Sequence, residues 1–385
     1  MSLAEPGVTG PLRGVRVVEL VGIGPGPFAA MMLADLGADV IRVDRPGGNA
    51  MQVAPPHQDI LGRGRPSVAV DLKQERGIEV ALDLVSSADI FLEGLRPGVT
   101  ERLGLGPEDC FARRPSLVYG RITGWGQDGP LAPRAGHDVN YIAVAGALDT
   151  LGRAGGPPQF PLNLLGDFAG GSLYLVAGVL AALTHARATG EGQVVDAAIV
   201  DGVAHLMSMH LSMQQGGTAT GGRGENLLDS GAPYYDVYET SDGRWMSVGA
   251  LEPQFYATLV SALGVGDLPD RADPSQWPAL RDRLTGIFAS RTQVEWIEAF
   301  DGTDACVAPI APLSEAPEHP HLRARGTYVE QDGLVQPAPA PRFSRTPASI
   351  STPPAAPGAN TAAALAAWGI QDVNGLLADG VVVQD

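Results

Sequence analysis

Residues 15–44 read VRVVELVGIGPGPFAAMMLADLGADVIRVD, and this stretch decides the predicted fold. Val15 to Leu20 is mostly apolar and rich in valine, which predicts a buried strand. A turn over Gly22 to Pro27 follows, and Phe28 to Leu36 predicts a helix that ends at Gly37. Ala38 to Asp44 predicts a second strand. A strand, a helix and a strand in this order form the unit from which parallel sheets are built.

The same alternation continues through the first half of the chain. Further strands are predicted at Ser67 to Leu72, Asp89 to Leu95, Leu117 to Ile122 and Gln193 to Ile199, with helices at Glu75 to Val85 and Asp167 to Arg187. Strands that alternate with helices indicate an α/β fold. We therefore expect a large Rossmann-like domain with a parallel sheet.

The second half has a different texture. Glycines are frequent between residues 216 and 224, and Ser241-Asp242-Gly243 lies between two strand-like segments, which predicts a hairpin. Helices then follow at Pro253 to Leu263, Trp277 to Ala289 and Gln293 to Phe300. The predicted organisation is a large domain over residues 11–200, completed by 330–385, a linker over 201–230, and a small α+β domain over 231–320. Residues 321–385 form a return strap and C-terminal tail, extended over the proline-rich stretch 337–357.

Composition excludes several classes of protein. The 385-residue chain carries a formal charge of −17, which argues against general binding to nucleic-acid phosphates. Cys110 and Cys306 are the only cysteines and form no metal motif, as expected in a reducing compartment. No signal peptide is apparent, and the longest apolar helix candidate, Gly171 to Leu183, is too short to span a bilayer. These features predict a cytoplasmic protein.

The turn Gly22-Ile23-Gly24-Pro25-Gly26-Pro27 imitates a dinucleotide-binding loop, with Asp44 as the acid that would bind a ribose. The spacing GxGxxG requires glycine where Pro27 stands. Pro25 and Pro27 also lack the N–H groups that hold a phosphate. The turn therefore does not favour a nicotinamide cofactor.

Cations gather around the ends of the predicted strands, and two of them, Arg63 and Arg65, lie in the loop before the third strand. Since strand carboxyl ends line the ligand crevice of an open α/β sheet, they suggest an anionic ligand with phosphates. The alternative is a set of ordinary surface side chains. The cations are Arg45, Arg63, Arg65, Lys73, Arg96 and Arg102.

His137 and Asp167 are conspicuous polar residues in glycine-rich or apolar surroundings. A histidine and a carboxylate held apart can act as two bases on opposite faces of one carbon. The structural alternatives are a hydrogen-bonded loop histidine and an aspartate that only caps the helix it begins.

The chain resembles the class III coenzyme A transferase superfamily, and within it the α-methylacyl-CoA racemases. The likeness runs from about Pro11 to about Pro347 and includes a GHD[IV]NY motif, whose histidine distinguishes the racemases from the transferases. The motifs that carry it include residues 12–20, 33–40, 42–46 and 96–99, Gly124-Trp125-Gly126-Gln127, Gly136-His137-Asp138-Val139-Asn140-Tyr141, Pro161-Leu162-Asn163-Leu164-Leu165-Gly166-Asp167-Phe168, and residues 192–197 and 249–256.

The resemblance implies an interlocked homodimer whose site lies between the large domain of one chain and the small domain of the other. It implies His137 and Asp167 as the two bases, with Glu252 supporting the histidine from the partner and Tyr235 supporting the aspartate. It also implies CoA-ester contacts from Arg45, Val70, Asp71, Leu72, Lys73, Gly94, Leu95, Arg96, Arg102, Gly136, Asp138, Val139, Asn140 and Tyr141.

The implied reaction interconverts (R)- and (S)-2-methylacyl-CoA thioesters through an enolate, in fatty acid and lipid metabolism. It requires no metal and no redox cofactor, because CoA arrives as part of the substrate. One alternative is a CoA transferase that forms an acyl anhydride on Asp167. Another is a non-catalytic acyl-CoA-binding protein.

Overall fold

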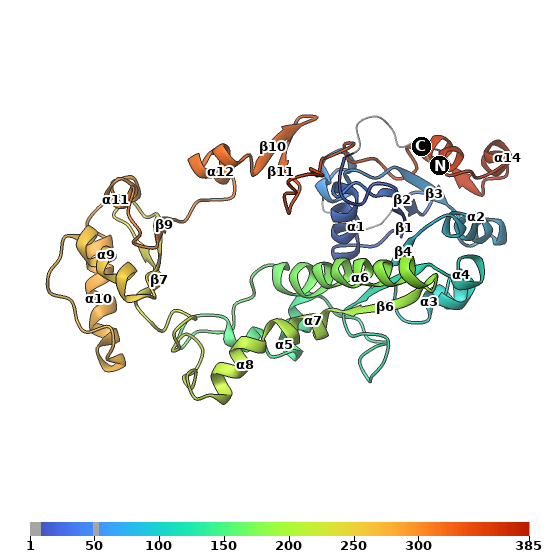
Figure 1. Ribbon diagram of the computed structural model, residues 1–385. Coiled ribbons are helices and arrows are strands. Elements are labelled where there is room, and N and C mark those ends of the chain that lie inside the picture. Colours follow the sequence, from blue (N-terminus) through green and yellow to red (C-terminus); the bar gives the residue numbers. More distant parts are fainter. Residues whose placement is uncertain (1–8, 49–53, 385) are drawn as a thin grey trace. The chain divides into compact units, whose positions relative to one another are not determined.

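The computed structural model describes residues 9–48 and 54–384, and the chain divides into two compact units. The large unit contains the described residues up to Ala145, residues 161–206 and residues from 324 onward (Figure 1). The small unit contains residues 146–160 and 207–323. The predicted boundaries differ from these at several points, and the small unit ends at Arg323 where the prediction gave 320. Residues 146–160 belong to the small unit, and the predicted linker 201–230 is divided between the two units.

A seven-stranded sheet organises the described part of the large unit. Its order is β12-β3-β2-β1-β4-β5-β6, and every neighbouring pair is parallel except β12 with β3. The strands are β1 (Arg16–Leu20), β2 (Asp39–Asp44), β3 (Ser67–Val70), β4 (Ile90–Glu93), β5 (Val118–Thr123), β6 (Gln193–Ala198) and β12 (Val382–Val383). The predicted parallel α/β sheet is confirmed.

The chain reverses its direction of travel across the sheet between β1 and β4. From β1 it first adds β2 and β3 on one side, then returns to add β4, β5 and β6 on the other. Such a switch point opens a crevice outside the carboxyl ends of the strands, where ligands of doubly wound sheets bind.

Helices cover both faces of this sheet. One face packs its apolar side chains against α1 (Pro25–Asp35) and α6 (Leu173–Thr189). The other face packs against α2 (Glu75–Ser86), α4 (Pro107–Arg113), α13 (Thr361–Ala367) and α14 (Val373–Ala378). Both faces are therefore buried, which explains why the strands read as continuous apolar runs.

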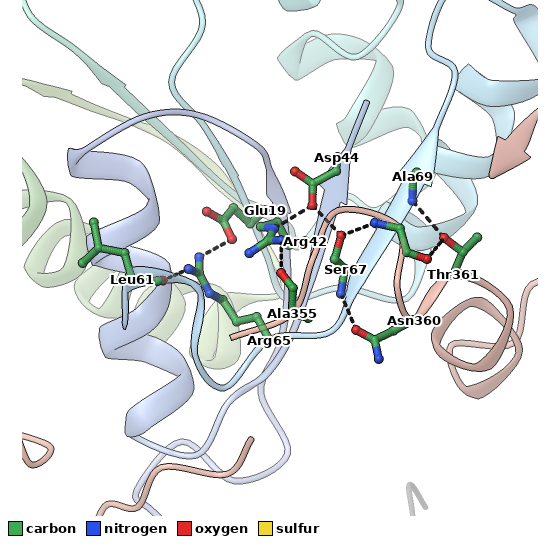
Figure 2. Close-up of polar contacts among 11 residues, drawn as sticks. Glu19, Arg42, Asp44, Leu61, Arg65, Ser67, Ala69, Ala355, Asn360 and Thr361 are labelled. Atoms are coloured by element: carbon green, nitrogen blue, oxygen red, sulfur yellow. Dashed lines mark hydrogen bonds and ion pairs between the residues drawn. The ribbon is translucent and has the colours of Figure 1, made fainter. Parts of the chain in front are cut away.

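The C-terminal segment returns to the large unit and is tied to β2 and β3 by buried polar groups (Figure 2). Asp44 accepts hydrogen bonds from Arg42 Nε at 2.7 Å and from Ser67 Oγ at 2.5 Å. Asn360 Oδ1 accepts from the Ser67 N–H, and Thr361 Oγ1 accepts from the Ala69 N–H. Asp44 therefore forms its hydrogen bonds within the large unit, to Arg42 and Ser67.

The small unit is an α+β assembly built on a three-stranded antiparallel sheet. The predicted hairpin is present as β7 (Tyr235–Glu239) and β8 (Trp245–Gly249), and β9 (Val307–Pro309) pairs with β8. The helices α9 (Pro253–Leu263), α10 (Trp277–Phe288) and α11 (Gln293–Phe300) enclose a separate apolar core with this sheet.

The remaining α-helices and strands of the described residues are short. They are α3 (Val99–Leu103), α5 (Asp138–Val144), α7 (Ile199–Leu206), α8 (Ser208–Gln215), α12 (Pro320–Arg325), β10 (Tyr328–Gln331) and β11 (Leu334–Pro337). The predicted return strap therefore contains a hairpin, because β10 and β11 pair antiparallel. Asp385, the last residue of the predicted tail, lies outside the described residues.

The predicted length of the apolar helix is wrong. A π-helix (Leu164–Ser172) runs directly into α6, so the helical segment Leu164–Thr189 has 26 residues and is long and apolar enough to cross a membrane by length and composition alone. Its inner side chains, among them Leu175 and Val179, are fully buried against the sheet. We therefore regard it as a core helix of the large unit.

Candidate active site

The π-helix places Asp167 in the large unit. Asp167 was predicted to begin the helix, but it is the fourth residue of a segment that starts at Leu164. Its N–H is not free, because it donates to Asp138 Oδ2 at 2.8 Å. Glycine permits the close packing of this wide helix: a Cβ at Gly170 would lie 2.7 Å from Val203 Cγ2. Such π-helical turns are often found at functional sites.

The glycine- and proline-rich turn after β1, residues 22–27, packs against the segment that carries Asp167. Gly24 has a left-handed φ of 71°, and a Cβ there would lie 3.3 Å from Asp167 Oδ2. Phe28 on α1 stacks on Phe168 with ring centroids 4.7 Å apart. Ser172 Oγ donates to the carbonyl oxygens of Pro25 and Asp167. The turn that imitates a dinucleotide loop therefore supports a carboxylate.

The environment of Asp167 favours its protonated form. Burial raises the pKa of the Asp167 carboxyl, and the neighbouring Asp138 charge raises it further. The side-chain amide of Asn163 donates to Asp167 Oδ2 at 3.1 Å and acts in the opposite direction, as does the nearby His137. The balance is a raised pKa, which suits a carboxyl group that donates a proton.

His137 is exposed and lies at the N-cap position of α5. Its backbone N–H donates to Asn140 Oδ1 at 3.1 Å, which closes the first turn of that helix. The residue after His137, Asp138, accepts a hydrogen bond from the Asp167 N–H at 2.8 Å, so the segments that carry the two predicted bases are in contact in the large unit. The next residue, Asp138, is only 6% exposed.

The segment that carries His137 is held by an aromatic pair. Tyr141 packs edge-on against Trp125 with centroids 4.8 Å apart, and its hydroxyl donates to the Gly136 carbonyl. Gly124 leaves room for the tyrosine ring, because a Cβ there would lie 1.9 Å from Tyr141 Cζ. The Gly124-Trp125 motif thus positions the backbone immediately before His137.

The predicted CoA contacts follow the carboxyl ends of the parallel strands. Arg45 follows β2, Lys73 follows β3 and Arg96 follows β4, and all three are exposed, as is Arg102 on α3. The other predicted contacts of the large unit lie at the end of β3 (Val70), in the turns after β3 and β4 (Asp71, Leu72, Gly94 and Leu95), and in or just before α5 (Gly136, Asp138, Val139, Asn140 and Tyr141). A small cavity at the switch point is lined by residues that include Glu19, Gly22, Glu93 and Gly94.

Two cations of the predicted anion site are placed differently. Arg63 and Arg65 are only 2% and 1% exposed. Arg63 pairs with Asp35 through two hydrogen bonds and also donates to Gln336, while Arg65 pairs with Glu19 (Figure 2). Both guanidinium groups pair with buried carboxylates inside the protein, so the prediction that they bind an anionic ligand is not supported.

A buried ion pair that the sequence did not indicate holds the turn after β4. Glu93 Oε1 accepts from Arg121 Nε at 2.7 Å, and Glu93 Oε2 accepts from the Leu95 N–H at 2.7 Å. Arg121 also donates to Glu101 on α3. This network fixes the turn that presents Arg96 and the helix that presents Arg102. The signal in the sequence that could have indicated this pair was a charged residue inside an otherwise apolar strand, Glu93 in β4 and Arg121 in β5.

The other two predicted site residues belong to the small unit. Tyr235 begins β7 and lines a cavity of about 540 Å³ together with residues that include Ser247 and Cys306. Glu252 is exposed at the N-cap position of α9. Burial raises the pKa of the Cys306 thiol, and the negative charge of Glu252 raises it further. The support of His137 by Glu252 and of Asp167 by Tyr235 stays a prediction.

Comparisons with known proteins identify the family of the chain. A family model described as CoA-transferase family III matches residues 12–361. Alpha-methylacyl-CoA racemase from Homo sapiens is 46% identical over 344 residues, which cover 88% of this chain and 87% of the relative. The Mus musculus protein of the same name is 45% identical over 340 residues, with the same two shares. The crystal structure of a CAIB/BAIF family protein from Brucella suis matches with a TM-score of 0.80 and 28% identity, over 94% of this chain and 100% of the other.

Proposed function

The chain belongs to CoA-transferase family III, and on this basis we propose that it is an isomerase that interconverts (R)- and (S)-2-methylacyl-CoA thioesters. The two racemases of similar sequence support the reaction, since each covers most of this chain. The observation that supports the proposal is the contact between the segments of His137 and Asp167, where Asp138 accepts from the Asp167 N–H, together with the burial that raises the pKa of the Asp167 carboxyl.

The two groups divide the proton transfer between them. Neutral His137 removes the α-proton of one enantiomer and becomes an imidazolium. Protonated Asp167 then delivers a proton to the opposite face of the enolate and becomes a carboxylate. The other enantiomer uses the same groups in reverse.

The enolate oxygen requires stabilisation, because a thioester α-proton is far less acidic than the conjugate acid of either base. The N–H of Asp167 is committed to Asp138 and is not a candidate. The N–H of Asp138 lies in the first turn of α5, where helix geometry offers no internal acceptor. It is the candidate donor to the thioester oxygen.

CoA arrives with the substrate, and its phosphates meet exposed cations at the strand ends. Arg45, Lys73, Arg96 and Arg102 are the proposed contacts, because each is exposed and follows the carboxyl end of β2, β3 or β4, or lies on α3 directly after β4. The scheme uses no metal and no redox group, since the proton is the only species transferred.

We propose that the enzyme acts as an interlocked homodimer. Large apolar side chains remain exposed near the candidate site: Val144 on α5, and Leu164 and Leu173 on the long helix, are 64%, 53% and 45% exposed. A second chain would cover such a surface and would bring Glu252 of its small unit to the site.

The reaction is tested by NMR of a 2-methylacyl-CoA incubated with the enzyme in heavy water. Both loss of the α-proton signal and loss of stereochemical purity are expected, starting from either enantiomer. An α-proton retained in both enantiomers, under conditions where the ester binds, would contradict the proposal.

Hydroxylamine distinguishes racemisation from CoA transfer. A transferase mechanism requires an acyl anhydride on Asp167, which hydroxylamine would convert to a hydroxamate. We expect no modified Asp167 by mass spectrometry after incubation with acyl-CoA and hydroxylamine. A hydroxamate at this residue would favour the transferase.

A further inference from the structure

Asp138 is a buried carboxylate with an incomplete set of hydrogen bonds. The residue is 6% exposed, and Oδ2 accepts from the Asp167 N–H at 2.8 Å. Oδ1 is buried and has no hydrogen-bond partner among the described residues. Burying a carboxylate with half of its acceptor capacity unused is costly, so a functional reason for it is expected.

The position of this carboxylate links the two proposed bases. Along the chain, Asp138 directly follows His137 and begins α5. Across space, its side chain binds the backbone of Asp167 in the π-helix. It is therefore a direct physical connection between the segment that carries the histidine and the segment that carries the carboxyl group.

The helix is built to admit this contact. A Cβ on Gly166 would lie 2.4 Å from Asp138 Oδ2 and 2.8 Å from its Cγ. Any side chain at position 166 would therefore push the carboxylate away from the Asp167 N–H. Glycine at this position and aspartate at position 138 depend on each other.

We propose that Asp138 is a positioning residue for proton transfer, which holds Asp167 against the His137 segment and places a negative charge beside the Asp167 carboxyl group. This inference rests on the proposed racemase function. It goes beyond it by giving the Asp138 side chain a role separate from that of its backbone N–H.

The charge of Asp138 acts in a defined direction. The groups that act on the Asp167 carboxyl are Asp138, His137 and Asn163, and Tyr141 is electrostatically coupled to it. Of these, Asp138 raises the pKa of Asp167, because a second negative charge nearby disfavours ionisation. A neutral residue at position 138 would lower that pKa. Because the reaction rate depends on the protonation states of both His137 and Asp167, the pH–rate profile would then move to lower pH.

The test compares three variants of the full-length enzyme. Asp138→Asn keeps an oxygen that accepts from the Asp167 N–H but removes the charge. We expect its pH profile of kcat to move to lower pH, with KM for the 2-methylacyl-CoA unchanged. Asp138→Ala removes the hydrogen bond as well, and misplacement of a reacting group is expected to lower kcat by about 10²-fold. Asp128→Asn, in an exposed loop, makes the same change in net charge and should leave the profile in place.

Gly166→Ala provides a second, independent test, because it displaces the Asp138 carboxylate without changing any charge. We expect a fall in kcat of about 10²-fold at unchanged KM, for both directions of the reaction. If Asp138→Asn does not fold, this variant decides the positioning role.

The outcomes separate the inference from the function on which it rests. A wild-type enzyme that exchanges no α-proton would overturn both. A racemising wild type, with an Asp138→Asn profile that superimposes on it, would overturn the electrostatic role alone. Wild-type turnover in Gly166→Ala would overturn the positioning role.

Discussion

Replacing Gly124 with alanine should damage catalysis although residue 124 carries no reacting group. The added Cβ would lie 1.9 Å from Tyr141 Cζ and 2.0 Å from Cε1, whereas ordinary contact begins near 3.4 Å. The ring would have to retreat by about 1.5 Å, but Tyr141 is 8% exposed and packs on Trp125, so it has little room.

The magnitude follows from this geometry. Overpacking a filled core typically costs about 1–3 kcal/mol, and a clash with a rigid ring places this variant near about 3 kcal/mol. The Tyr141 hydroxyl binds the Gly136 carbonyl, so displacement of the ring also displaces the backbone before His137. A shift of about 1 Å in a catalytic group can cost about 10²-fold in rate. We therefore expect kcat to fall by about 10²-fold.

The assay measures kcat and KM for both enantiomers, together with the free energy of unfolding. Gly266→Ala is the matched control, because its Cβ would meet no heavy atom within 4 Å and its φ is ordinary for an L-residue. A double-mutant cycle with Tyr141→Leu should show strong coupling in stability, since the clash requires both side chains. Wild-type kcat and stability in Gly124→Ala would refute the reasoning.

Three further predictions address the reaction and the assembly. His137→Ala should lower the racemisation rate, measured by NMR exchange, by about 10²–10⁴-fold, while calorimetry shows that CoA-ester binding is retained. Wild-type turnover in this variant would exclude a two-base scheme. Replacing Arg45 and Arg96 with alanine should raise KM more than it lowers kcat, because these residues are proposed to bind parts of CoA that are remote from the reacting carbon. A large fall in kcat at unchanged KM, measured by steady-state kinetics, would show that they do not bind the nucleotide. Co-expressed His137→Ala and Glu252→Ala chains should recover up to about half of the wild-type activity per dimer, because one composite site stays intact in each heterodimer. Verified heterodimers without activity would exclude a site shared between the two chains.

The alternation of strands and helices could be predicted because it depends on neighbouring residues. The parallel sheet, the hairpin around Ser241 to Gly243 and the helices α9 and α11 follow from apolar periodicity and turn residues within short windows. The motif around His137 was visible for the same reason. Each of these signals is contained within a few consecutive positions.

The predictions that failed depended on partners far away in the chain. Asp167 looked like a helix start because an aspartate preceded an apolar run. The structure extends the helix to Leu164 and directs the Asp167 N–H to Asp138, 29 positions earlier. A π-helix has no distinct sequence signal here, because its wide turn is permitted by glycines whose neighbours, such as Val203, come from other elements.

Residue type and short-range order were enough to predict the fold class, the family resemblance and the two proposed bases, because all three depend on motifs of consecutive residues. Long-range packing decides which of the charged side chains become buried. Arg63 and Arg96 are both arginines close to strands of the sheet, but Arg63 is buried against Asp35, 28 positions away, and Gln336, 273 positions away, whereas Arg96 is exposed. Burial and pairing arise from long-range packing, so local residue order cannot specify them.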